Sequence, residues 1–300
     1  MNIGITGWWK NGNEGDFRIL ECMTRALAPH SIVPIDLPFS LNEDSLHRMN
    51  LLDFIVLGGG GLFQDAPPPH PFQDFEVWGK RLQTPIGVAG VGIDAILPEY
   101  RASVHALAEQ ARFFFVRDRV SEQIAGHPKV QVAPDLTFLY PIDSGEAQQT
   151  FSRNSIVCGV NLRNFAGFAP EQWIETLQAL PFHLRGIPMA TYDSWQEIEL
   201  LQRLDPTFAG VFDSCLYQGL GMMIGTAFHS VVFAIQAAIP VIGIAYAPKV
   251  HRLMADIGLE RFSLEPNQWQ KLPRLLDTLL DQHRELSVYL RETTHRLTES

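Results

Sequence analysis

Several basic and aromatic residues occupy positions at which the folded protein could bind a small anion and transfer a proton. His229 follows a short apolar run, and an imidazole can act as a general acid near neutral pH. Tyr246 and Lys249 follow the next apolar run, and Arg163 follows an earlier one. A guanidinium forms paired hydrogen bonds with carboxylate or phosphate groups. These residue types together predict a site for a negatively charged ligand.

The stretch 222–249 indicates how three of these side chains could meet. Met222–Ile224 is predicted to be a strand, a helix is expected from about Phe228–His229, and Val241–Ala245 is predicted to be a second strand. This strand–helix–strand unit places its strands in parallel, and ligands of such sheets bind at the carboxyl edge. We therefore expect His229, Tyr246 and Lys249 on one edge, beside a helix N-terminus that favours anions.

The first part of the chain has its own candidates. A strand is expected at Asn2–Thr6, and Asn13 and Asp16 come between it and the next helix. Asp16 could be only a helix N-cap, or it could be a carboxylate held at the sheet edge and facing a cleft. Four consecutive glycines follow the strand Phe54–Leu57. Because glycine allows positive φ and close approach, we take Gly59 and Gly60 as backbone room for a ligand or a neighbouring strand.

Two more charged residues follow predicted strands. Arg117 stands at the end of Phe113–Val116, where it could bind substrate or pair with Asp118. Asp135 comes after the strand Val130–Val132. Residues 90–95 fit the dinucleotide pattern G-x-G-x-x-A, but a proline precedes the next helix, which argues against a nicotinamide site.

The alternation of strands and helices over 300 residues predicts an α/β fold with two domains. The polar, aperiodic segment Pro141–Asn154 is the expected linker, which gives domains 1–145 and 155–300. We further expect a strand at Phe208–Val211 and a Ser194/Glu197 capping box that opens a helix. The tail 268–297 is predicted to form two amphipathic helices.

Composition narrows the class of protein. A net charge of −10 argues against general nucleic-acid binding. The three cysteines show no metal or redox spacing, and no D-x-D motif occurs, so no metal site is expected. No signal peptide is expected, and the longest apolar run is short for a membrane span. The sequence predicts a cytoplasmic protein; peripheral membrane association and homo-oligomer formation stay open.

The motifs, taken in order, resemble those of the polysaccharide pyruvyl transferases over nearly the whole chain. The matching residues are Asn13-x-Gly15-Asp16, Gly58–Phe63, Gly90-x-Gly92-Ile93, Arg117-x-x-x-Ser121, Pro134-Asp135, Leu162-Arg163, His229, Ala234, Pro240, Tyr246 and Lys249. One departure is Ala227, where the family pattern has arginine two residues before the histidine.

The resemblance implies a glycosyltransferase-B-like fold, with two Rossmann-like domains facing across a cleft. It implies no cofactor, phosphoenolpyruvate as donor, and a sugar or lipid-linked glycan as acceptor, with the product a pyruvate ketal. Arg163, His229 and Lys249 would bind the donor, with His229 also the candidate acid. Asp16 or Asp135 would act on the acceptor.

Two other functions stay open. One is a metal-independent nucleotide-sugar glycosyltransferase, and the other is a non-catalytic protein that only binds sugar. Ala227 favours the second, because it removes one candidate guanidinium from the anion site. The loop Ala66–Pro71 is a candidate flap over the cleft.

Overall fold

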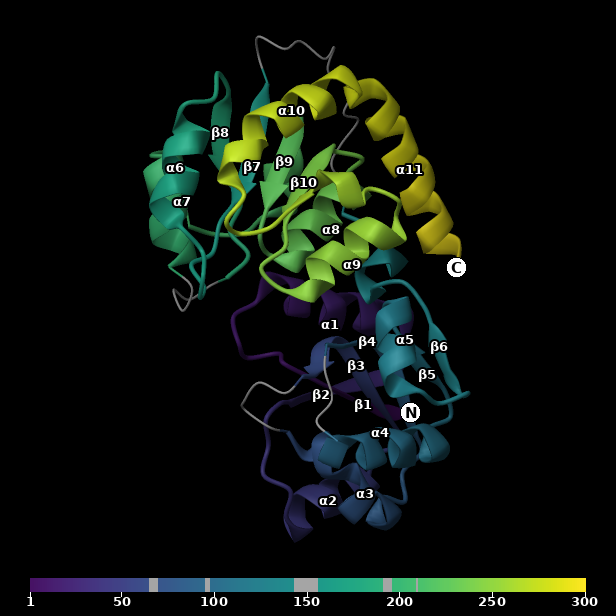
Figure 1. Ribbon diagram of the computed structural model, residues 1–300. Helices are drawn as coiled ribbons and strands as arrows, with labels where there is room; N and C mark the ends of the chain where they lie inside the picture. The colour runs from purple at the N-terminus through teal and green to yellow at the C-terminus, as the bar shows by residue number, and fades with distance from the viewer. Residues whose placement is uncertain (65–69, 95–97, 143–155, 191–195, 209) are drawn as a thin grey trace. The chain divides into compact units, whose positions relative to one another are not determined.

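The computed structural model describes residues 1–64, 70–94, 98–142, 156–190, 196–208 and 210–300. The chain divides into two compact units, residues 1–139 and 140–299, called below the N-terminal and C-terminal units. Each unit is built around its own parallel sheet (Figure 1). Most of the expected linker, residues 143–154, and residues 66–69 of the expected flap lie outside the described part of the chain.

The N-terminal unit alternates strands with helices. Its strands are β1 (Asn2–Gly7), β2 (Ser31–Asp36), β3 (Phe54–Phe63), β4 (Ile86–Ile93), β5 (Phe114–Val116) and β6 (Val130–Val132). Its α-helices are α1 (Glu14–Ala26), α2 (Glu43–Asn50), α3 (Phe75–Trp78), α4 (Pro98–Gln110) and α5 (Arg119–Ala125). The strands pair in parallel in the order β2-β1-β3-β4-β5-β6. Helix α2, which the sequence analysis missed, is opened by a capping box between Asn42 and Ser45.

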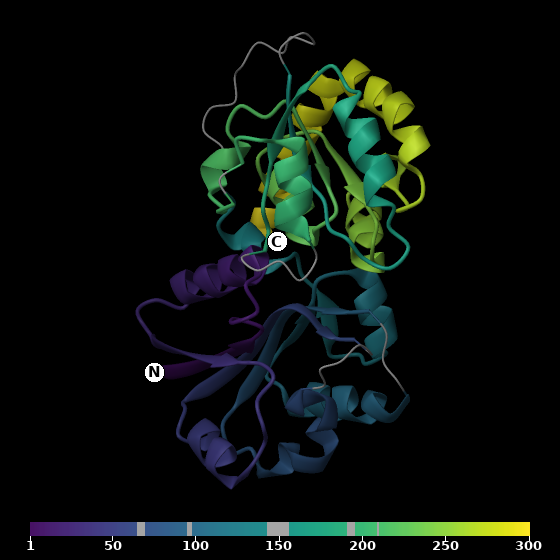
Figure 2. The same ribbon diagram turned by 90° about the vertical axis from the view of Figure 1, so that its left-hand side faces the viewer.

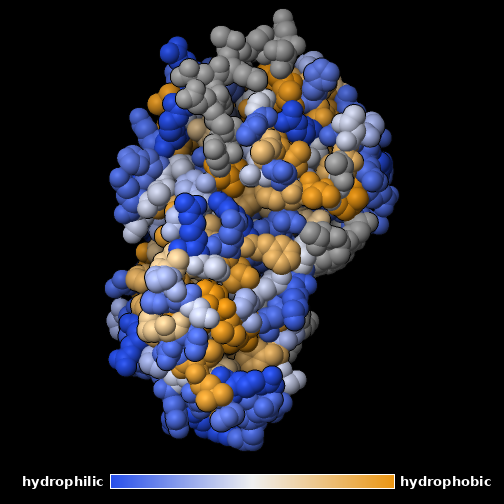
Figure 3. Space-filling model, turned by 180° about the vertical axis from the view of Figure 1, so that it is seen from behind, coloured by the Kyte–Doolittle hydropathy of each residue, from blue (hydrophilic) through white to orange (hydrophobic). Residues whose placement is uncertain are grey.

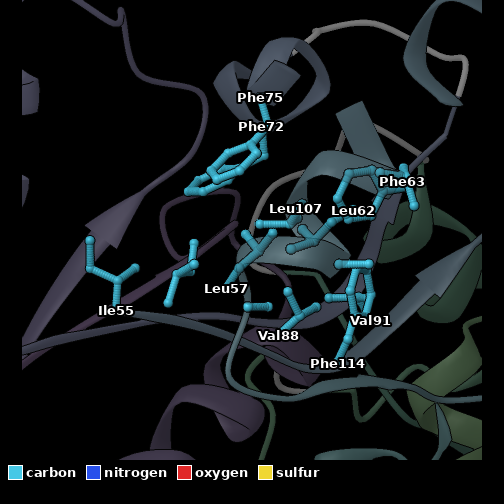
Figure 4. Close-up of a cluster of buried hydrophobic side chains, with 14 of the residues drawn as sticks. Ile55, Leu57, Leu62, Phe63, Phe72, Phe75, Val88, Val91, Leu107 and Phe114 are labelled. Atoms are coloured by element: carbon cyan, nitrogen blue, oxygen red, sulfur yellow. The ribbon is translucent and has the colours of Figure 1, made fainter. Parts of the chain in front are cut away.

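Alternate residues of the central strands enter two separate apolar clusters. Ile55 and Leu57 of β3 belong to one cluster, while Val56 between them packs with Ile19 and Met23 of α1 in the other. Since successive strand residues point to opposite faces, the sheet is buried on both sides. Figure 2 shows helices on both sides of this sheet. Part of the first cluster, which also contains Phe72, Phe75 and Leu107, is shown in Figure 4.

The glycine run is part of β3 rather than a turn after it. Gly59 and Gly60 have φ of +71° and +81°, values that other residues rarely adopt. A Cβ at Gly59 would lie 2.2 Å from Cγ2 of Ile19, and one at Gly58 would lie 2.7 Å from Cε of Met23. Packing therefore explains Gly58 and Gly59, because they let α1 approach the sheet closely.

The edges of this sheet are β2 and β6, each with one partly exposed valine, Val33 (39%) and Val132 (41%). Pro34 of β2 has no backbone N–H to offer an added strand. In the view from behind, several hydrophobic residues gather over the middle of the N-terminal unit and are flanked by hydrophilic ones (Figure 3). None of the helices in the described part of the chain combines the length and apolar character needed to cross a bilayer.

The C-terminal unit repeats the alternation. Its strands are β7 (Val157–Asn161), β8 (His183–Gly186), β9 (Met222–Gly225), β10 (Val241–Ile244) and β11 (Ser263–Leu264). Its α-helices are α6 (Pro170–Gln178), α7 (Glu197–Leu204), α8 (Phe228–Gln236), α9 (Pro248–Asp256), α10 (Leu272–Asp281) and α11 (His283–Glu299). The strands pair in parallel in the order β11-β10-β9-β7-β8. The predicted β9–α8–β10 unit and the two tail helices are confirmed.

One expectation for this unit is wrong. Phe208, Gly210 and Val211 lie outside any strand; the ring of Phe208 packs over Gly186 of β8, where a Cβ would meet it at 2.7 Å. Ser194 of the expected capping box lies outside the described residues. The N-cap of α7 is Gln196, whose side chain makes no capping hydrogen bond, and the Glu197 carboxylate accepts from Arg163.

Candidate functional site

Three neighbouring strands of the C-terminal unit carry the predicted anion-binding residues past their carboxyl ends. Strand β9 lies between β7 and β10, with Asn161 and Gly243 both in register with Gly225. Arg163 follows β7, His229 follows β9 within the first turn of α8, and Tyr246 follows β10. The structure therefore brings these residues to one edge of one sheet, as the sequence predicts.

Asn161 fixes the start of helix α8. Its Oδ1 accepts hydrogen bonds from Thr226 Oγ1 (3.0 Å) and the Ala227 N–H (2.9 Å), and its Nδ2 donates to the Ile187 carbonyl (2.9 Å). It is fully buried and so ties together the ends of β7, β8 and β9. The position of His229, two residues after the Ala227 N-cap, is set by this network.

The imidazole of His229 is held among aromatic rings. The side chain is 6% exposed, and its ring lies 5.1 Å from that of Phe228 and 5.8 Å from that of Phe233, measured between centroids. All nine residues of α8 are buried, and α11 packs against it through a Thr294 Oγ1 hydrogen bond to the Ile235 carbonyl (3.0 Å). The site histidine thus sits on a rigid, centrally packed helix.

Lys249 and Tyr246 form a second contact on this edge. The Lys249 Nζ lies 5.1 Å from the centre of the Tyr246 ring, a cation–π arrangement. The Phe165 ring, from the segment after β7, lies 5.2 Å from the same tyrosine. The segments after β7 and β10 therefore touch, and the lysine lies over an aromatic ring.

Arg163 is paired with Glu197, which the sequence analysis assigned to a helix capping box. Its Nε donates to Glu197 Oε2 at 2.5 Å, and the two side chains are only 7% and 0% exposed. The Arg163 guanidinium, expected to bind an anion, is thus also part of a buried ion pair. Burial, and next the charge of Glu197, raise the pKa of the nearby Tyr217, which stays a neutral donor to the Ser230 carbonyl.

In the N-terminal unit, Asn13 and Asp16 have different roles. Asn13 is the N-cap of α1, and its side chain accepts from the Gly15 N–H at 3.0 Å. Asp16 lies inside the first turn, so the N-cap alternative for it is wrong. Its Oδ2 accepts from Asn11 Nδ2 (2.9 Å), and its Oδ1 is 3.1 Å from where a Cβ of Gly60 would be. Asp16 is thus a carboxylate held against the backbone of β3.

Arg117 lies over the ends of β3 and β4. A Cβ at Gly92 would be 2.4 Å from its Nη2, and one at Gly61 would be 3.6 Å from the same atom. Asp94 Oδ2 is 4.0 Å from that Gly61 position, so a carboxylate and a guanidinium flank the glycine. Asp118, the alternative partner of Arg117, caps α5 by accepting from the Ser121 N–H (2.7 Å).

Asp135 has a turn-forming environment. Its Oδ1 accepts both from the Thr137 N–H (3.0 Å) and from Thr137 Oγ1 (2.8 Å), and the residue is 5% exposed. The following residue, Leu136, packs over Gly90. The Asp135 carboxylate therefore stabilises the turn after β6. Asp16 is the better candidate for a carboxylate that acts on a ligand.

Three residues were missed as site residues from sequence: Asn161, Glu197 and Asp94. Asn161 ends an apolar strand with a buried amide, a signal that sequence can give. Glu197 is recognised only through Arg163, which is distant in the chain. Asp94 is recognised only because it and Arg117 flank Gly61. Among the described residues, no group of three His, Cys, Asp or Glu side chains is arranged to hold a metal ion.

Comparisons with known proteins agree with this geometry. The sequence model of the family described as polysaccharide pyruvyl transferase matches residues 13–248. No curated protein sequence matches the chain at a significant level. Solved structures similar to the chain include HepE of Anabaena in complex with UDP and glucose, at 12% identity over 100% of this chain and 95% of that one, with a TM-score of 0.61.

Two further structures show the same likeness. The S. aureus MnaA–UDP structure is 11% identical over 97% of this chain and 90% of that one, with a TM-score of 0.58. A UDP-GlcNAc 2-epimerase of Methanocaldococcus jannaschii is 10% identical over 100% of both chains, with a TM-score of 0.55. At such identities the likeness shows the fold alone. It confirms the predicted class: two parallel-sheet, Rossmann-like α/β domains of glycosyltransferase-B-like type.

Proposed function

We infer the reaction from one premise: the chain belongs to the polysaccharide pyruvyl transferase family. It is therefore a transferase of the kind that modifies polysaccharides. We propose that it moves pyruvate from phosphoenolpyruvate onto a sugar of a surface polysaccharide or its precursor as a ketal, with release of phosphate. The observation that carries the proposal is the set of basic side chains, Arg163, His229 and Lys249, past the ends of three adjacent strands.

The donor brings a carboxylate and a phosphate, and both need counter-charge. In the proposal Arg163 and Lys249 bind these groups, since charge-assisted hydrogen bonds to such oxygens are the strong ones. Tyr246 orients the lysine and is a further hydroxyl donor at the same edge. The glycines at the strand ends and the buried rings around His229 keep the site rigid. A rigid site favours electrostatic stabilisation of the transition state by groups that are already in position.

The chemistry adds a proton to carbon and forms two C–O bonds. His229 would donate a proton to the methylene carbon of phosphoenolpyruvate, giving a methyl group and a cationic carbon next to the carboxylate. One sugar hydroxyl attacks that carbon, phosphate leaves with its bridging oxygen, and a second hydroxyl closes the ketal. Two hydroxyl protons are lost; one balances the methyl group and the other leaves on hydrogen phosphate.

A carboxylate of the N-terminal unit would accept a hydroxyl proton from the acceptor. Asp16 suits this role better than Asp135, because both contacts given above for Asp135 Oδ1 come from its own turn. Arg117 and Asp94, which flank Gly61, would hold further hydroxyl groups of the sugar. A guanidinium donates and a carboxylate accepts, so such a pair suits an uncharged polyol.

Ala227 supplies the N–H that Asn161 accepts and is 2% exposed, so its side-chain position faces packed protein. Loss of the family arginine removes one charge-assisted contact, worth about 1.5–3 kcal/mol. In the proposal Lys249 supplies the remaining positive charge, and Arg163, which is paired with Glu197, supplies directed hydrogen bonds. The three cysteines form no disulfide in the described part of the chain, which supports a cytoplasmic location as part of the same proposal.

Replacing Lys249 with methionine tests the donor site. Lys249→Met keeps the aliphatic stem and removes the charge, so the KM for phosphoenolpyruvate should rise by about 10-fold or more. Lys271→Met, at an exposed lysine of the same unit, is the matched control and should leave that KM unchanged. Steady-state phosphate release at saturating acceptor measures both. An unchanged KM in Lys249→Met would remove this lysine from the donor site.

A methyl group at Gly92 tests the acceptor side. Gly92→Ala places a Cβ 2.4 Å from the Arg117 guanidinium without needing positive φ, so the arginine must move while the strand is kept. We expect kcat/KM for the acceptor to fall by about 10-fold, the value of one charged hydrogen bond. Gly61→Ala meets Arg117 at an ordinary 3.6 Å and should have a smaller effect. Equal effects of the two variants would contradict this placement of Arg117.

The reaction itself is tested with purified protein, phosphoenolpyruvate and a panel of hexopyranosides and lipid-linked sugars. Phosphate release that depends on the acceptor, with a new ketal methyl signal in the proton NMR spectrum of the product, is the expected result. Phosphoenolpyruvate that stays intact with every acceptor would argue against the proposal.

One alternative has its own support. Two of the similar structures are complexes with UDP, which favours a metal-independent nucleotide-sugar glycosyltransferase as second candidate. Thermal-shift titrations with phosphoenolpyruvate and with UDP- and GDP-sugars separate the two. A non-catalytic sugar-binding protein would bind acceptor sugars and release phosphate with none of them.

A further inference from the structure

The ion pair between Arg163 and Glu197 is one part of a larger link between the end of β7 and the start of α7. Glu197 accepts from Arg163 Nε (2.5 Å) and from the backbone N–H groups of Met189 and Ala190, the latter at 2.9 Å. A buried carboxylate is costly unless it is paired and fully hydrogen-bonded. Three donors meet that requirement, so the Glu197 carboxylate has a defined position.

A second hydrogen bond joins the residues that are adjacent in sequence to Arg163 and Glu197. Asn164 Nδ2 donates to Gln196 Oε1 at 2.5 Å, one residue along from each member of the ion pair. Gln196 has a φ of +48°, a left-handed conformation that costs free energy for a residue with a side chain. Such conformations persist where the surroundings over-determine them, and they are concentrated at functional sites.

We propose that Glu197 is a positioning residue that orients the Arg163 guanidinium toward an anionic ligand of the carboxylate or phosphate class. The inference rests on the proposed function in taking phosphoenolpyruvate as that ligand. A guanidinium offers a two-pronged contact either through Nε and one Nη or through both Nη atoms. Because Nε is committed to Glu197, the two-pronged contact with the ligand must use the Nη1/Nη2 edge.

The pairing also decides what Arg163 contributes. Glu197 cancels its charge, so its contribution to anion binding is directional rather than a gain of net positive charge. Net positive charge on this edge then comes from Lys249. The two views of Glu197 predict opposite changes in anion affinity. By charge alone, removal of Glu197 would tighten anion binding. A positioning role requires that its removal weaken binding.

The test is isothermal titration of the full-length chain with phosphoenolpyruvate and with inorganic phosphate. In Glu197→Gln we expect the Kd for phosphoenolpyruvate to rise by about 10-fold. In an Arg163→Met background the same substitution should change the Kd by less than about twofold, since it would act only through the missing arginine. Glu171→Gln, which breaks the exposed pair with Arg203 in the same unit, is the control and should leave the Kd unchanged.

Three results would overturn the inference. They are an unchanged Kd in Glu197→Gln with a lowered melting temperature, tighter binding in that variant, or an equal effect with Arg163 absent. If Glu197→Gln does not fold, Glu197→Asp keeps the charge with a shorter reach and should still weaken binding. Wild type that binds phosphoenolpyruvate but releases no phosphate counts against the proposed function only. Wild type that binds neither anion counts against both.

Discussion

His229→Ala should lower kcat for pyruvyl transfer by about 10²–10⁴-fold, the usual contribution of a positioned general acid. His229 is 6% exposed and lies in the first turn of α8, whose start is fixed by Asn161. If it donates the proton, kcat falls strongly while the KM for phosphoenolpyruvate changes less. Single-turnover and steady-state phosphate release separate these two quantities.

The matched control is His251→Ala, which removes an exposed histidine of α9 in the same unit and should leave kcat unchanged. His229→Gln keeps a polar side chain of similar length and should be nearly as inactive as the alanine variant, since an amide is not a proton donor of the required acidity. Normal turnover of His229→Ala in folded protein would take the histidine out of the mechanism.

Gly59→Ala should destabilise the N-terminal unit by about 2–5 kcal/mol. The backbone has φ +71°, and left-handed geometry costs other residues about 1–2 kcal/mol. The new Cβ would also lie 2.2 Å from Cγ2 of Ile19, and overpacking a core typically costs a further ~1–3 kcal/mol. Urea denaturation followed by fluorescence measures the sum.

Gly126→Ala separates the two causes. Gly126, in the same unit, has φ +60° but a nearest atom at 3.7 Å, so its substitution carries only the backbone cost. The difference between the two variants is the packing contribution, and Ile19→Ala should reduce it in the Gly59→Ala background. If Gly59→Ala is no less stable than Gly126→Ala, α1 is not packed on β3 as closely as described here.

The β9–α8–β10 unit could be predicted from sequence because every boundary has a local signal. Gly225 follows the first apolar run, and Pro240 separates the helix from the second strand. The placement of His229 and Tyr246 at one edge then follows from parallel topology alone. Apolar runs likewise predicted strands β1, β3, β5 and β6 of the N-terminal sheet.

The failures arose where a distant partner decides the role of a residue. The glycines of β3 suggest room for a ligand or a neighbouring strand until α1 is known to pack on them. Glu197 fits a capping pattern, yet Arg163, 34 positions away, takes its carboxylate. Phe208–Val211 has the composition of a strand, but the Phe208 ring packs on β8 instead. Asn13 and Asp16 both suit a helix start, and only geometry assigns the cap to Asn13.

A crystal structure of the protein soaked with phosphoenolpyruvate tests the central assignment most directly. We predict density for the donor at the carboxyl edge of β7, β9 and β10, with its oxygens within hydrogen-bond distance of Arg163 and Lys249 and its methylene carbon facing His229. Donor bound at any other place in the chain, or this edge occupied by a UDP-sugar while phosphoenolpyruvate leaves no density, would contradict it.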